Sequence, residues 1–215
     1  MRLRNIPGAK EEMFVNPFVV QEPENKKGKW NEIYGAERPF HIEIGTGKGG
    51  FITRLAALNP DVNYLGIEKY SSALIKAVRK REEMTDADNL FFLRFDAEYI
   101  PQIFAGGEID RIYLNFSDPW PKDRHAKRRL TSTHFLAMYE ELLSDGGQVE
   151  FKTDNRSLFD FSLAELELKG WELLACTYDL HADLALNEGN IMTEYEQRFS
   201  EEGVPICKYI ARPGR

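Results

Sequence analysis

Four acidic residues stand at or just after the ends of four successive apolar runs: Glu43, Glu68, Asp96 and Asp118. If these runs are parallel strands of one sheet, their carboxyl ends converge on the crevice where open α/β sheets bind ligands. The first run leads into a glycine-rich stretch, 45–50, where the backbone can turn sharply and a ligand can reach the N–H groups of the next helix. This combination predicts a ligand site lined by carboxylates.

The glycine-rich stretch alone does not choose the ligand. Gly45, Gly47 and Gly50 match the dinucleotide pattern G-x-G-x-x-G, and a glycine-rich turn without a ligand is the plain alternative. A carboxylate at Glu43 disfavours a pyrophosphate but suits a cationic sulfonium ligand that carries an amino group. Glu68 is placed to bind ribose hydroxyls, and Asp96 to accept from the adenine amino group. Together they favour S-adenosylmethionine over a nicotinamide cofactor.

A second candidate stretch follows the fourth apolar run and reads Asn-Phe-Ser-Asp-Pro-Trp-Pro-Lys over 115–122. Pro119 and Pro121 fix φ and remove two donors, so this loop is predicted to be stiff. With Asp118 and the flat ring of Trp120 it forms a clamp suited to a planar base. A rigid turn with a buried tryptophan is the alternative.

Basic residues are concentrated immediately after this loop, in a chain whose net charge is −7. The cluster consists of Lys122, Arg124, His125, Lys127, Arg128 and Arg129. Its isolation in an acidic chain favours contact with RNA phosphates over an ordinary solvated face. The affinity for RNA should then fall with salt.

Strand-like and helix-like patterns alternate from Pro39 onward, which predicts a mostly parallel sheet with helices on both faces. The expected strands are 40–44, 63–67, 90–95, 111–116 and 148–152, and the expected helices are 50–58, 71–84, 97–104, 132–143 and 156–169. Ser71 and Ser132 are candidate N-caps, and 146–147 and Gly170 are candidate helix stops.

Two further strands, 171–178 and 205–211, are expected to pair antiparallel at one edge of the sheet, which completes seven strands. A long connection, 179–204, joins them, with a short helix at 193–200. Residues 1–38 are read as an N-terminal extension that packs on the domain or meets a partner, and 39–215 as the domain itself.

The composition excludes several classes of protein. No apolar run approaches the roughly 20 residues of a membrane span, and the polar start of the chain does not resemble a signal peptide. Cys176 and Cys207 lie in strand-like segments, where reduced buried thiols and a cytoplasmic location are expected. The four histidines are scattered, so no metal site is predicted.

From about Arg38 to its end, the chain resembles the bacterial tRNA (guanine-N7-)-methyltransferases. The resemblance rests on the stretches that begin at Glu43 and Asn115 and on Thr-Glu-Tyr-Glu at 193–196. It implies a Rossmann-like class I methyltransferase fold, S-adenosylmethionine as methyl donor, and tRNA as substrate, with the target guanosine in the variable loop. Whether the protein is a monomer or a homodimer stays open.

The resemblance also implies roles for particular residues. The cofactor would be held by Glu43, Gly45, Gly47, Glu68, Asp96 and Asp118, with Asp118 also catalytic. The substrate would be contacted by Lys122, Asp154, Thr193, Glu194, Tyr195 and Glu196, and the RNA by the basic cluster. From the residues alone, Asp154 could equally cap the next helix, and 193–196 could be only a helical turn.

Nitrogen 7 of guanine has a lone pair and no proton, so methylation there needs alignment rather than a general base. A carboxylate facing the guanine N–H groups stabilises the positive charge that develops and selects guanine over adenine. Asp118 is the first choice for this carboxylate, with Asp154 or Glu194 as helpers. The alternatives are a nicotinamide-dependent oxidoreductase, a methyltransferase with a non-RNA substrate, and a non-catalytic RNA-binding module.

Overall fold

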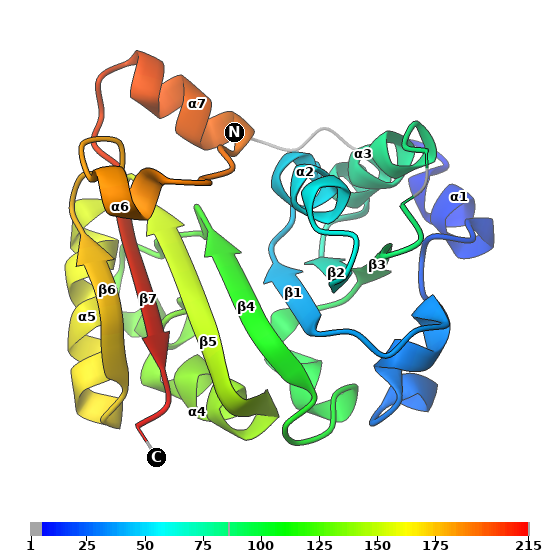
Figure 1. The fold of residues 1–215 in the computed structure, drawn as a ribbon, viewed down its shortest axis with the longest axis horizontal. Helices are drawn as coiled ribbons and strands as arrows, with labels where there is room; N and C mark the ends of the chain where they lie inside the picture. The colour runs from blue at the N-terminus through cyan, green and yellow to red at the C-terminus, as the bar shows by residue number, and fades with distance from the viewer. Residues whose placement is uncertain (1–5, 86, 215) are drawn as a thin grey trace.

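The computed structural model describes residues 6–85 and 87–214, and a seven-stranded sheet runs through it (Figure 1). The strands are β1 (Phe40–Ile44), β2 (Asn63–Glu68), β3 (Leu90–Arg94), β4 (Ile109–Asn115), β5 (Leu143–Thr153), β6 (Glu172–Thr177) and β7 (Cys207–Arg212). Their order is β3-β2-β1-β4-β5-β7-β6. The strands β1 to β5 run parallel to one another, and β7 is antiparallel to both of its neighbours, β5 and β6. The predicted Rossmann-like fold is confirmed, but the antiparallel strand lies one place inside the edge.

Helices cover both faces of the sheet, as predicted (Figure 1). They are α1 (Ala9–Val15), α2 (Gly50–Leu58), α3 (Ser71–Glu82), α4 (Thr133–Leu142), α5 (Arg156–Lys169), α6 (Leu184–Asn187) and α7 (Glu194–Glu201). Short 3-10 helices cover Pro23–Lys26, Trp30–Tyr34, Ala97–Gln102 and Asp123–Arg128. One apolar cluster joins α4 and α5 to the sheet, and a second joins α1, α2 and α3 to it. No helix in the described part of the chain has the length and apolarity to span a bilayer.

Glycine is required where the loop after β1 packs on α3. Gly49 has φ 75°, and a Cβ added there would lie 2.6 Å from the Cβ of Ala77. Any larger residue would push this loop off the helix. The absence of a side chain at Gly49 therefore lets the loop after β1 pack directly against α3.

Several helix boundaries differ from those expected. Ser71 is the first residue of α3 rather than its cap. Ser132 occupies the N-cap position of α4, as predicted, but its hydroxyl donates to the carbonyl of Lys127 and makes no capping hydrogen bond. Pro101 limits the expected helix at 97–104 to a 3-10 turn. Gly146 and the glycine after it lie inside β5, because α4 ends at Leu142 and the chain extends at once. Gly170 ends α5 in the left-handed region, as predicted.

The described part of the N-terminal extension, from residue 6, packs on the domain, and its first five residues lie outside the described part. Trp30 is 1% exposed, and its indole Nε1 donates to the carbonyl of Ile103 at 2.8 Å. Phe92 of β3 exchanges backbone hydrogen bonds with Phe18 and Val20, both 2.8 Å long. The extension therefore covers an edge that would otherwise expose unpaired backbone groups.

Candidate active site

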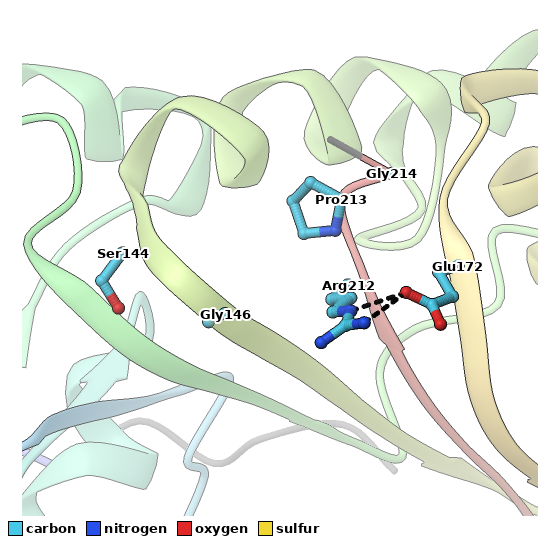
Figure 2. Close-up of a pocket in the computed structure, with 7 residues that line it drawn as sticks. Ser144, Gly146, Glu172, Arg212, Pro213 and Gly214 are labelled. Carbon is cyan, nitrogen blue, oxygen red and sulfur yellow. Dashed lines mark hydrogen bonds and ion pairs between the residues drawn. The ribbon is translucent and has the colours of Figure 1, made fainter.

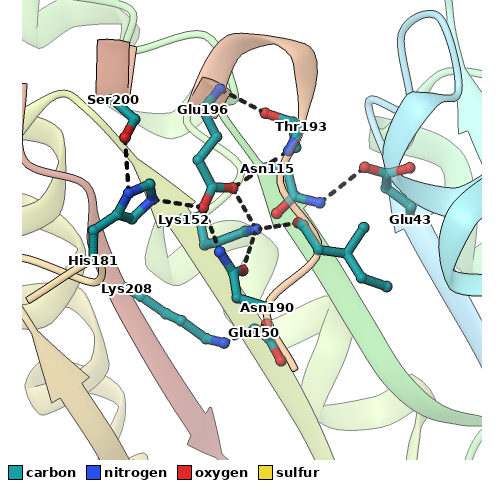
Figure 3. Close-up of polar contacts among 11 residues, drawn as sticks. Glu43, Asn115, Glu150, Lys152, His181, Asn190, Thr193, Glu196, Ser200 and Lys208 are labelled. Carbon is teal, nitrogen blue, oxygen red and sulfur yellow. Dashed lines mark hydrogen bonds and ion pairs between the residues drawn. The ribbon is translucent and has the colours of Figure 1, made fainter. Parts of the chain in front are cut away.

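Glu43, the next-to-last residue of β1, is a buried carboxylate, 2% exposed, that accepts from two donors. The hydroxyl of Thr46 donates to it at 2.5 Å. The side-chain amide of Asn115 donates to it at 2.9 Å (Figure 3). Burial raises the pKa of Glu43, and these hydrogen bonds oppose the rise. Sequence reasoning did not single out Asn115, although a polar side chain at the end of an apolar strand was the available indication.

Asn115 offers a second acceptor beside this carboxylate. Its Oδ1 is buried and has no hydrogen-bond partner among the described residues. A buried acceptor next to a carboxylate suits a donor that carries positive charge, such as the ammonium of an amino acid. The residues present therefore fit the amino group of S-adenosylmethionine.

The glycine loop lies between β1 and Glu68 of β2. Gly45 and Gly47 have φ values of 80° and 57°, and a Cβ at Gly45 would meet nothing within 4 Å. Glu68 accepts from the backbone N–H of Gly47 at 3.0 Å and of Tyr70 at 2.8 Å. Burial raises the pKa of Glu68, and the charge of Asp118 raises it further. Glu68 thus shapes the glycine loop and interacts electrostatically with Asp118 of the loop after β4.

Asp96 is tied to other partners. It caps the 3-10 helix after β3 by accepting from the N–H of Glu98 at 3.3 Å, and it pairs with Lys69 at 2.5 Å. It nevertheless lies two residues after the end of β3, the strand beside β2, as the adenine-binding prediction requires.

The loop 116–122 follows β4 and is called the reaction loop below. Its backbone is strained at two positions. Phe116 and Trp120 have φ values of 52° and 41°, in the left-handed region that costs non-glycine residues roughly 1–3 kcal/mol each. Arg129 stabilises the loop by donating to the carbonyls of Pro119 at 3.0 Å and Trp120 at 3.1 Å. Asp118 is exposed within this loop. The surroundings thus hold a conformation that the loop alone would not favour.

The basic cluster divides into two groups. Lys122, Arg124, Lys127 and Arg128 are exposed on and beside the 3-10 helix Asp123–Arg128. Arg129 instead turns inward to the loop carbonyls, which sequence reasoning missed. The ring of Trp120 is half-buried, with the guanidinium of Arg128 5.0 Å from its centre and His125 packed edge-on.

α7 lies over the carboxyl ends of the central strands (Figure 1). Its side chains contact both the glycine loop and the loop after β4. Glu194 pairs with Lys48 of the glycine loop at 2.9 Å and with Lys80 of α3 at 2.7 Å. Both lysines lower the pKa of Glu194, Lys80 more strongly. The ring of Tyr195 stacks on Phe116 of the reaction loop, with centroids 6.2 Å apart. The segment 190–196, called the late segment below, therefore lies beside the carboxyl ends of the first four strands.

The surroundings of three predicted substrate residues, Thr193, Glu196 and Asp154, bear on their assigned roles. Glu196 is fully buried and is engaged by Lys152, Asn190 and His181, so in this structure it holds the late segment together rather than facing a substrate. Thr193 and Glu196 form the capping box of α7. Asp154 is not the cap of α5, because Asn155 accepts from the N–H at the third helical position. The capping alternative for Asp154 is wrong, and substrate contact stays a prediction.

A cavity of about 180 Å³ lies away from this site, at the start of β5 and the end of β7 (Figure 2). Arg212 and Glu172 form an ion pair of 2.7 Å in its wall. Since the carboxylates gather at the other ends of the parallel strands, this cavity is not part of the candidate active site.

Solved structures with the same architecture are methyltransferases. An antibiotic-related methyltransferase aligns over 91% of this chain and 96% of its own, with a TM-score of 0.64 and 18% identity. The 16S rRNA methyltransferase KamB aligns over 85% of this chain and 91% of its own, with a TM-score of 0.62 and 14% identity. These identities show similarity of fold alone. The fold is therefore that of the class I methyltransferases.

Comparison with known sequences identifies the family within this fold class to which the chain belongs. Residues 37–209 match the family described as "Putative methyltransferase" (Methyltransf_4). The chain is 63% identical to the tRNA (guanine-N(7)-)-methyltransferase of Lachnoclostridium phytofermentans over 98% of both chains. It is 48% identical to the enzyme of that name from Bacillus subtilis over 97% of both. The chain belongs to the tRNA (guanine-N(7)-)-methyltransferase family.

Proposed function

We propose that this protein transfers a methyl group from S-adenosylmethionine to nitrogen 7 of a guanosine in the variable loop of tRNA. The observation that carries the proposal is the placement of Glu43, Glu68 and Asp118 at or just after the carboxyl ends of three neighbouring parallel strands, β1, β2 and β4. The chain is also 63% identical to a relative named tRNA (guanine-N(7)-)-methyltransferase. The catalytic domain is 39–215, and a cytoplasmic location fits a tRNA substrate.

The cofactor contacts follow from the chemistry of each side chain. Glu43 and the free Oδ1 of Asn115 bind the ammonium group, and Glu68 binds the ribose hydroxyls. Asp96 accepts from the adenine amino group, and Gly45 and Gly47 let the ligand lie against the backbone. When bound, S-adenosylmethionine supplies a methyl group attached to a sulfonium centre. The electron pair of the carbon–sulfur bond stays on the sulfur when the methyl group is transferred.

The protein's task in the reaction is alignment and charge stabilisation. Guanine N7 brings its own lone pair, so no residue has to remove a proton before attack. Asp118 accepts from the guanine N–H groups and stabilises the positive charge that methylation places on the base. Lys122, Asp154, Thr193 and Tyr195 contact the nucleotide around it.

The exposed part of the basic cluster binds the tRNA backbone. Lys122, Arg124, Lys127 and Arg128 point to solvent next to the reaction loop, where each can neutralise a phosphate. His125 adds a contact beside Trp120. Arg129 stabilises the conformation of the reaction loop and does not itself contact a phosphate.

The decisive experiment is transfer of labelled methyl from S-adenosylmethionine to unmodified tRNA, followed by nucleoside analysis. Label as 7-methylguanosine is expected, and it should be lost with a transcript that lacks the variable-loop guanosine. Label in another nucleoside, or none at all with measurable binding of adenosylhomocysteine, would refute the assigned reaction. Binding of NADH in place of adenosylhomocysteine would favour an oxidoreductase instead.

A further inference from the structure

Lys152 of β5 is a buried lysine with no part in the roles assigned above. Its side chain has zero exposure, although it lies only one residue before β5 ends at Thr153. Its Nζ donates to Asn190 Oδ1 at 3.0 Å, to the carbonyl of Ile191 at 3.0 Å and to Glu196 Oε2 at 2.7 Å (Figure 3). An ammonium group has three donors, so its hydrogen-bonding capacity is fully used.

All three acceptors belong to the late segment 190–196, far along the chain from Lys152. Glu196 in turn gathers the rest of that segment. Its Oε2 also accepts from the N–H of Thr193, and its Oε1 bonds Asn190 at 2.6 Å and His181 at 3.1 Å. One ammonium and one carboxylate therefore fix the start of α7 and the residues before it to the central sheet.

Lys152 also lies close to the cofactor side of the site. Its Nζ is 5.1 Å from the ring centre of Phe51 in α2. Its charge lowers the pKa of Glu43 against the larger effect of burial. Lys152 is thus placed between the carboxylate that binds the cofactor and the segment that carries Thr193 and Tyr195.

Stability alone is a poor account of this arrangement. A buried ion pair gains little over well-packed apolar residues, because desolvation of the two charges offsets their attraction. Three directed hydrogen bonds, by contrast, define one position for the segment that they hold. Lys152 fixes the position of residues in the connection between β6 and β7, which has more than 20 residues. Loops of this length are usually mobile or functional.

We propose that Lys152 is a positioning residue for methyl transfer, which holds 190–196 so that Thr193 and Tyr195 meet the substrate in register with the reaction loop. The inference rests on the proposed function. Lys152 touches neither cofactor nor base in this account. Its loss should therefore lower kcat and loosen the late segment while cofactor affinity is nearly retained.

Lys152→Met tests this against Lys208→Met as a matched control. Lys208 lies opposite Lys152 on β7, is also buried, and pairs with Glu150 at 2.9 Å rather than with the late segment. Lys152→Met should speed hydrogen exchange of the amides at 190–201 and lower kcat by roughly 10- to 100-fold, with the Kd for adenosylhomocysteine changed less than about threefold. Lys208→Met should lower Tm comparably without these changes.

A second variant covers the case in which Lys152→Met does not fold. Asn190→Ala removes one acceptor of Lys152 and one donor to Glu196 without leaving a buried charge unpaired. It should give the same changes to a smaller extent. If the wild type is active but both variants match Lys208→Met in exchange and kcat, the inference is refuted. If the wild type transfers no methyl to tRNA, the proposed function fails, and the exchange data still report separately whether Lys152 holds the segment.

Discussion

The side-chain amide of Asn115 donates to the carboxylate of Glu43 at 2.9 Å and so joins the ends of two neighbouring strands, β4 and β1. Thr46 holds the same carboxylate from the glycine loop. A group fixed by two donors loses little freedom when a ligand binds, which lowers the entropic cost of binding. The geometry of the proposed ammonium site is therefore set by the protein itself.

Removing the charge of Glu43 should weaken cofactor binding. Glu43→Gln keeps the shape of the side chain but removes an acceptor charge worth about 1.5–3 kcal/mol to a charged donor. The Kd for adenosylhomocysteine, measured by calorimetry, should rise about 10- to 150-fold. Glu172→Gln, the same change in the wall of the distant cavity, should leave the Kd unaltered. An unchanged Kd in Glu43→Gln would remove Glu43 from the cofactor site.

Removing Asp118 should affect catalysis more than folding. The side chain is exposed, so Asp118→Ala leaves no cavity. Loss of a fixed group that stabilises developing charge typically costs about 100- to 1,000-fold in kcat. The measurement is kcat for tRNA at saturating S-adenosylmethionine, with Asp123→Ala in the nearby exposed segment as control. Near-normal turnover in Asp118→Ala would show that another group carries the role.

The two neighbouring arginines should behave differently toward salt. Arg128→Ala removes an exposed charge, so the slope of log Kobs against log salt for tRNA binding should shrink by about 0.7–0.9. Arg129→Ala removes the donors to Pro119 and Trp120, so it should lower kcat and Tm with little change in slope. Equal slope changes in the two variants would contradict the division of the basic cluster that the structure indicates.

Partly buried His41 should make the free energy of unfolding depend on pH. Burial lowers its pKa from 6.5 to about 4, with a smaller effect from Arg111. Below pH 6.5 the unfolded chain takes up a proton that the folded protein does not. The free energy of unfolding therefore falls as the pH drops toward 4, by up to about 1.4 kcal/mol per pH unit. Urea unfolding of the wild type and His41→Gln between pH 5 and 7 should show a shallower dependence in the variant, and parallel curves would count against the shift.

The sequence by itself determined the strands, most of the helices and the place of the glycine loop, because these follow from local patterns. Apolar runs and caps act over a few residues, so β1 and α2 begin and end where the pattern indicates. The same reasoning placed acidic residues at strand ends, since parallel strands bring those ends together. The family resemblance could also be found from the sequence, because it rests on three short stretches of consecutive residues.

Only the tertiary structure decided which distant side chains meet. Lys152 and Glu196 are 44 positions apart, and nothing local to either one indicates the other as its partner. The inward turn of Arg129 and the insertion of β7 between β5 and β6 are of the same kind. The free energy of burying a charge or an open strand edge depends on the neighbours that the whole fold supplies. Pairing of this kind is therefore settled by packing and lies beyond the reach of local sequence patterns.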